Sequence, residues 1–157
     1  NFAGSGLADP GPGDSSLGGL GEVRRLLEGH IAYLAAKRAT ESDIAMLEKT
    51  LQTRKPEEST RDSDFRFHKK LSTMAGNALL QSMVGTVQGS MNTFRQRYQK
   101  MPGPIAHNFD LSHREIFECT RAKDPAGARA AIARHIDMGW MDVRDAGLRT
   151  HLPEEEE

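Results

Sequence analysis

Cysteine is nearly absent from this sequence, because its 157 residues contain only Cys119. No disulfide can therefore form within the chain, and a reducing compartment such as the cytoplasm is the expected location. No apolar run approaches the ~20 residues that a membrane-spanning helix needs. A basic excess is also missing, since 21 Lys and Arg stand against 22 Asp and Glu. These absences argue against a membrane protein and against a nucleic-acid-binding surface on this chain.

The two ends of the chain differ in composition from its middle. The chain begins without a methionine, and residues 1–21 are rich in Gly, Pro and Ser with few apolar side chains. Such a segment buries too little apolar surface to offset its ordering entropy, so we predict a flexible linker or the remnant of a longer protein. Residues 149–157 end in four glutamates and are predicted to be a disordered acidic tail. One folded domain is expected between them, over residues 22–148.

Apolar residues recur at helical spacing throughout this domain. They return every three or four residues, and no alternating strand pattern competes with them. Local patterns mark several ends: Thr40 and Asp43 form a variant of the capping box, Gly76 with Asn77 is a stop, and Asp124 with Pro125 is a start. The expected helices cover about 22–39, 40–52, 60–75, 78–99, 105–122 and 125–143. The predicted fold is all-α, a single domain built as an antiparallel bundle of about six helices.

A few residues on the expected buried faces are unusual for a helical core. The stripe of the first helix includes Val23 and also His30, which we expect to line the core or a pocket. Gly85 and Gly89 lie four residues apart in the fourth helix, where each glycine costs ~1 kcal/mol relative to alanine. We therefore predict that another backbone approaches closely there. The methionines at helical spacing, among them Met83 and Met138, are predicted to fill the core.

Four residues that can bind a metal ion also occupy inward-facing positions, on three different helices. Asp64 and His68 are four residues apart, so their side chains meet on one face. His113 and His135 lie at helical spacing from apolar residues of the fifth and sixth helices. Buried imidazoles and carboxylates need partners, and such a set suits a divalent transition metal such as zinc, nickel, copper or iron. The lack of thiolates argues against a closed structural zinc site, and a five- or six-coordinate ion keeps positions open for a small carboxylate.

Periodicity alone leaves a plainer interpretation open. A single core-side histidine is more often a hydrogen-bonded core residue than a metal ligand, and an Asp–His pair at this spacing also forms as an ion pair. His107 and His151 are expected on the solvent side. Cys119 has no neighbour in the sequence that would activate its thiol, so we expect it to be inert.

Three segments resemble the C-terminal ligand-binding domain of the GntR superfamily of bacterial transcription regulators, the FadR C-terminal-domain (FCD) family. The resemblance covers about residues 21–148. "EVRRLLEGHIAYLAAKRAT" resembles the first helix of the family, with Glu22, Arg24 and Glu28 in its E-x-R-x-x-x-E pattern. "DSDFRFHKKLSTMAGNALL" resembles its Asp/His signature before Gly-Asn, and "SHREIFECTRAKDPAGARAAIARHI" resembles its ending. Thr120 departs from the alanine that is common there, and six helices rather than seven indicate the VanR-like subgroup.

This resemblance implies both a site and a function. In metal-binding members, the matching residues Asp64, His68, His113 and His135 hold one divalent ion, for which zinc or nickel is the first expectation. A small organic acid would bind beside the ion, with Arg24 as the first candidate for an effector-facing cation and Asn77 and Arg95 as weaker ones. The family carries a winged helix-turn-helix domain before this one. We therefore expect this chain to sense an effector and form a homodimer, and to reach operator DNA only through that other domain.

Two other hypotheses for the function stay open from the sequence. An Asp/His₃ site with an open position could activate water in a metal-dependent hydrolase, although no separate general acid or base is evident. A purely structural dimerisation module is the third reading, in which Gly85 and Gly89 allow close helix packing.

Overall fold

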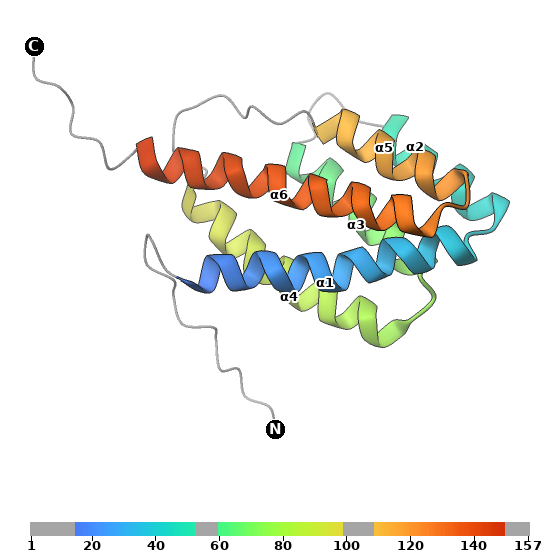
Figure 1. Cartoon of the computed structure of the whole chain (residues 1–157), viewed down its shortest axis with the longest axis horizontal. Coiled ribbons are helices and arrows are strands. Elements are labelled where there is room, and N and C mark those ends of the chain that lie inside the picture. Colours follow the sequence, from blue (N-terminus) through green and yellow to red (C-terminus); the bar gives the residue numbers. More distant parts are fainter. Residues whose placement is uncertain (1–14, 53–59, 99–108, 150–157) are drawn as a thin grey trace, which may run out of the picture.

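A computed structural model describes residues 15–52, 60–98 and 109–149, with side chains described over 19–52, 62–90 and 110–139. These residues form six helices and no strand: α1 (Ser15–Arg38), α2 (Glu41–Gln52), α3 (Thr60–Met74), α4 (Ala78–Tyr98), α5 (Phe109–Arg121) and α6 (Pro125–Arg149). The predicted all-α bundle is confirmed (Figure 1). No described helix is both long enough and apolar enough to pass through a membrane.

The bundle is built around the pairing of α1 with α6, which lie side by side and run in opposite directions (Figure 1). Small side chains allow this close packing: Ala32 and Ala35 on α1, and Ala128 and Ala131 on α6, are completely buried. The other helices add larger core residues, including Phe67 from α3. The site described below lies where α3, α5 and α6 converge against α1.

Three of the predicted helix ends are confirmed by their capping contacts. The Asp43 amide donates to Thr40 Oγ1 at 3.1 Å while the Thr40 amide donates to Asp43 Oδ2 at 3.1 Å, which completes a reciprocal capping box before α2. Asn77 Oδ1 accepts from the Leu80 amide, and Asp124 Oδ1 accepts from the Gly127 amide. The residue before Asn77, Gly76, has φ of +62°, a left-handed conformation that ends α3 at low cost because glycine has no Cβ.

The first helix begins at Ser15, inside the segment that was predicted to be linker. Glycines at 18, 19 and 21 disfavour a helix, but packing of α1 along α6 outweighs that local preference. α6 continues to Arg149, beyond the end expected near residue 143. Residues 1–14 and 150–157, the rest of the predicted linker and tail, lie outside the described ranges.

Several expected core positions are exposed instead. His30 is on the surface, where its ring stacks with Tyr33 at 6.1 Å between centroids and its Nδ1 lies 3.3 Å from Arg129 Nη2. Val23, Met83 and Met138 are each more than 40% exposed. The buried face of α1 includes instead Arg24 and Glu28, two polar residues that pair with each other in the core.

The close backbone approach predicted at Gly85 and Gly89 is not made within the described part of the chain. A methyl group added at either position would meet nothing within 4 Å, apart from its own helix. Completely buried alanines lie instead on α1 and α6, the two helices that pack side by side.

Candidate metal centre

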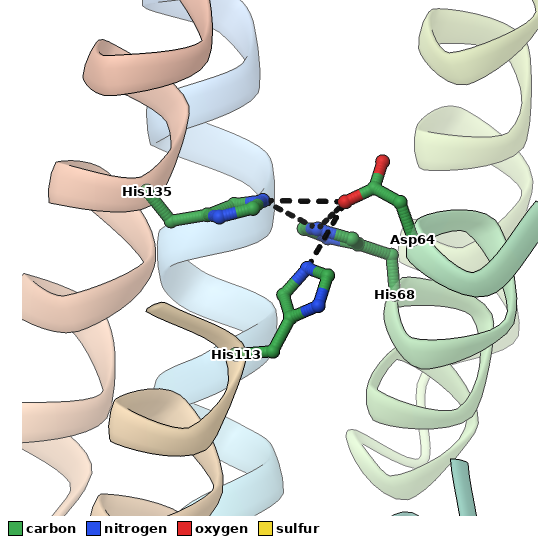
Figure 2. Close-up of side chains that lie close together, drawn as sticks. All are labelled: Asp64, His68, His113 and His135. Atoms are coloured by element: carbon green, nitrogen blue, oxygen red, sulfur yellow. Dashed lines mark hydrogen bonds and ion pairs between the residues drawn. The ribbon is translucent and has the colours of Figure 1, made fainter. Parts of the chain in front are cut away.

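The four predicted ligands come together in the middle of the bundle. α3 contributes Asp64 and His68, α5 contributes His113, and α6 contributes His135 (Figure 2). All four are buried, with exposed fractions of 2–5%. One candidate ligand atom from each lies within 4.8 Å of the others. Helices that are distant in sequence thus place three imidazoles and one carboxylate around a common point.

The atoms that face one another are the three Nε2 atoms and one oxygen, Asp64 Oδ1. His113 Nε2 lies 3.0 Å from this oxygen, and His68 Nε2 and His135 Nε2 each lie 3.4 Å from it. His68 Nε2 and His135 Nε2 are 3.0 Å apart. The rings therefore point the same type of nitrogen at one carboxylate oxygen, as Figure 2 shows.

These separations fit the ligand shell of a single small ion. Ligand atoms about 2.1 Å from an ion are about 3.0 Å apart at a right angle and about 3.4 Å apart at the tetrahedral angle. The separations between Asp64 Oδ1 and the Nε2 atoms fall at 3.0 and 3.4 Å. Imidazole nitrogens with one carboxylate are also the donor types that zinc and nickel accept. Both the geometry and the chemistry of the residues fit a divalent transition metal.

Two of the rings are held from behind by side chains that are not themselves candidate ligands. His68 Nδ1 lies 2.7 Å from Glu28 Oε2 on α1, and His135 Nδ1 lies 2.9 Å from Ser112 Oγ on α5. A proton on Nδ1 satisfies either contact and leaves the Nε2 lone pair directed at the common point. Glu28 is in turn paired with Arg24, whose Nε lies 2.7 Å from Glu28 Oε1.

Burial opposes each charge in the cluster, and the neighbouring groups decide which charges remain. At His68, the carboxylates of Glu28 and Asp64 outweigh burial and raise the pKa to about 9. Burial lowers the pKa of His135 to about 3 and also lowers the pKa of His113. At Asp64, the charge of His68 and hydrogen bonds from the rings outweigh burial and hold the pKa well below its ordinary value. Without a metal ion, the neutral-pH cluster therefore contains one imidazolium and one carboxylate.

These shifts predict how the stability of the metal-free domain depends on pH. The folded-state pKa of His68, about 9, lies above its ordinary value of 6.5. Its contribution to stability is therefore fully present below pH 6.5 and is lost as the pH rises toward 9. We expect the free energy of unfolding, measured by urea denaturation with a chelator present, to fall between pH 6.5 and 9.

The His68→Gln variant is the control for this prediction, because it removes the titrating group. Its stability should change less than that of the wild-type domain over the same pH range. A wild-type free energy of unfolding that stays constant or rises from pH 6.5 to 9 would contradict the assigned protonation of His68.

The three predicted effector-binding residues occupy different positions in the structure. Arg24 is buried beside the cluster, where it pairs with Glu28 four residues further along α1. Asn77 is exposed, and its side chain caps α4. The side chain of Arg95 lies outside the described residues, as do His107 and His151.

The cysteine that was expected to be inert is Cys119. Burial raises the pKa of its thiol, and nearby carboxylates raise it further, so the reactive thiolate form is disfavoured.

Sequence reasoning missed Glu28 and Ser112 as parts of the site. Both follow the helical spacing of buried residues: Glu28 precedes Ile31 by three, and Ser112 precedes Ile116 by four. Polar residues at such positions are usually assigned to a helix surface, and the spacing alone does not say which imidazole each one contacts.

Comparison with known proteins gives the family of the chain. Residues 20–138 match the family model described as the FCD domain. The galactonate operon transcriptional repressor of Escherichia coli (strain K12) is 27% identical over 138 residues, covering 82% of this chain and 58% of the repressor. The HTH-type transcriptional regulator LutR of Bacillus subtilis (strain 168) is 28% identical over 123 residues, covering 73% of this chain and 56% of that protein.

A solved structure, Streptococcus agalactiae GntR, matches with a TM-score of 0.60 and 28% identity, covering 82% of this chain and 58% of that chain. This chain thus spans less than three fifths of the length of the curated relatives it matches. Both curated relatives are named as regulators of transcription, and neither name describes an enzyme. The chain belongs to the FCD domain family, as its sequence motifs predicted, and its relatives are GntR-family regulators of transcription.

Proposed function

We propose that this domain senses a small organic acid through a bound divalent metal ion and passes that information to a DNA-binding domain. The observation that carries the proposal is the convergence of three Nε2 atoms on Asp64 Oδ1 within a buried cluster. The residues proposed to hold the ion are Asp64, His68, His113 and His135, and zinc or nickel is the proposed metal. When bound, the ion supplies a Lewis-acidic centre to which a carboxylate can bind.

Arg24 is the residue of this chain best placed to assist an acidic effector. Its guanidinium is buried, and the charge of Asp64 is among the causes that raise its pKa, so it lies within electrostatic reach of the cluster. Pairing with Glu28 uses Nε, and a guanidinium has four further N–H donors. One relative is named as the repressor of a galactonate operon. Galactonate is a sugar acid, which agrees with a carboxylate effector. The VanR-like subgroup and a small carboxylate as the effector stay predictions.

The output is proposed to be a change in how two copies of the domain position DNA-binding domains. Each relative is longer than the region it shares with this chain, and one is named as an HTH-type regulator. We propose a homodimer that acts in the cytoplasm, with operator DNA contacted through a winged helix-turn-helix domain outside this chain. The effector would shift the bundle toward one arrangement of its helices only if it binds that arrangement more tightly than the other.

A melting screen of the metal-loaded domain against small carboxylates tests the sensor. Galactonate, lactate and citrate are suitable first probes. An acid present at about 100 times its dissociation constant stabilises by about 2.7 kcal/mol, or about 5–11 °C for a domain of this size. The Asp64→Ala variant is the control and should show no shift with the same acid.

Two outcomes would contradict the sensor proposal. A broad panel of organic acids that leaves the metal-loaded domain unchanged would remove the effector role. Hydrolysis of esters or phosphates that disappears in the Asp64→Ala variant would instead indicate a metal-dependent hydrolase.

A further inference from the structure

The first helix contributes no candidate ligand, yet it reaches the metal centre through a buried ion pair. Glu28 is only 2% exposed and lies between the guanidinium of Arg24 and the imidazole of His68. Its Oε1 is 2.7 Å from Arg24 Nε, and its Oε2 is 2.7 Å from His68 Nδ1. α1, drawn in pale blue, passes behind the cluster in Figure 2. The Nδ1 atom of His68 contacts Glu28 on this helix. The contacts form a continuous chain from α1 to the proposed ligand atom.

Stability alone does not account for this arrangement. Burying an arginine and a glutamate costs several kcal/mol per ion, and replacing a buried ion pair by apolar residues is often neutral or stabilising. α1 also buries apolar side chains, among them Leu27 and Ile31, so apolar residues can fill the buried face of this helix. The buried charge is placed where it contacts one imidazole, which indicates a role at that imidazole.

We propose that Glu28 is a positioning residue for the metal centre, which fixes the His68 ring through Nδ1 and ties it to α1 through Arg24. This inference rests on the proposed metal site. In the metal-bound state the Glu28 carboxylate would accept a hydrogen bond from Nδ1–H of His68, 2.7 Å away, so the ring keeps its proton on Nδ1 and presents its Nε2 lone pair to the ion as a stronger donor. Ser112 holds His135 in the same way but is uncharged, so its effect is smaller. A change in metal occupancy thereby acts directly on the buried face of α1.

The first test is the Zn²⁺ affinity of variants, measured at one fixed pH by competition with a chromogenic chelator. Glu28→Gln is expected to weaken Zn²⁺ binding by about 10- to 100-fold, the range typical for outer partners of metal ligands. Ser112→Ala should weaken it less. The matched control is Glu118→Gln, which removes an exposed carboxylate paired with Arg121 and should leave the affinity unchanged.

A second variant separates positioning from folding. Glu28→Gln leaves Arg24 buried without its anion, which can destabilise the fold. The double variant Arg24→Met with Glu28→Gln removes both charges, and it should show the same 10- to 100-fold loss while its metal-free helicity matches that of the wild type. Wild-type Zn²⁺ affinity in a folded double variant would overturn the proposal.

A measurement on the unaltered protein is independent of any variant. ¹⁵N imidazole spectra of the Zn²⁺-loaded domain should show His68 protonated at Nδ1 and metal-bound at Nε2. Metal bound through Nδ1 of His68 would overturn the proposed role of Glu28, while the proposal of a metal centre at this cluster would stand. A domain that binds no Zn²⁺ in either experiment would overturn the proposed function first, so the two failures are distinguishable.

Discussion

Removing the metal ion is expected to lower the melting temperature of the domain by about 8–16 °C. The cluster brings three Nε2 atoms and a carboxylate oxygen together in the core, so the proposed ion would bind the folded state and not the unfolded chain. A ligand at about 1,000 times its dissociation constant stabilises by about 4 kcal/mol, and each kcal/mol is worth about 2–4 °C in a domain of this size. Circular dichroism melts before and after dialysis against a chelator measure the effect.

The melt should recover when Zn²⁺ is added back to the dialysed protein, because the metal-free fold keeps its imidazolium–carboxylate cluster. The Asp64→Ala variant serves as the reference and should melt at the same temperature with and without chelator. Identical wild-type melts in the two conditions, with Zn²⁺ shown to be removed, would mean that the ion does not stabilise this fold.

Replacing Asp64 by alanine is expected to weaken Zn²⁺ binding by more than about 100-fold, beyond the range typical of outer partners of metal ligands. Asp64 Oδ1 faces every other candidate ligand, because all three Nε2 atoms lie within 3.4 Å of it. It is also the only anionic group among the four candidate ligands. Isothermal titration of the metal-free protein with Zn²⁺ measures the loss.

Asp62→Ala is the matched control for this substitution. It removes the same side chain from the same helix two residues earlier, at an exposed position in the first turn of α3. Its Zn²⁺ affinity should equal that of the wild type. Equal losses in the two variants would show that the effect belongs to α3 stability or net charge and not to a ligand role of Asp64.

The four candidate ligands could be predicted because helical spacing is a property of short segments. Asp64 and His68 share a face by their separation of four residues, and His113 and His135 follow the apolar stripes of α5 and α6. Their donor types suggested a shared metal site, and the family motifs supported it. The helix ends at Thr40 and Asp124 were predictable for the same reason, since each cap is a contact within three residues.

The features that sequence reasoning missed depend on contacts between distant segments. Whether His30 or Glu28 faces inward is decided by how α1 is rotated against α6 and α3, and no local pattern fixes that rotation. The early start of α1 at Ser15 is likewise a result of packing that overrides the weak helix preference of glycine. The contact of Glu28 with the predicted ligand His68 was therefore not predicted.

The central claim is that the buried Asp/His₃ cluster binds one divalent ion. Elemental analysis of the purified domain, after equilibration with Zn²⁺ or Ni²⁺ and removal of excess metal, tests it most directly. We predict one ion per chain in the wild type and in Asp62→Ala, and none in Asp64→Ala. A wild-type domain that is folded yet retains no stoichiometric ion would contradict the claim and leave the cluster as a buried network of hydrogen bonds.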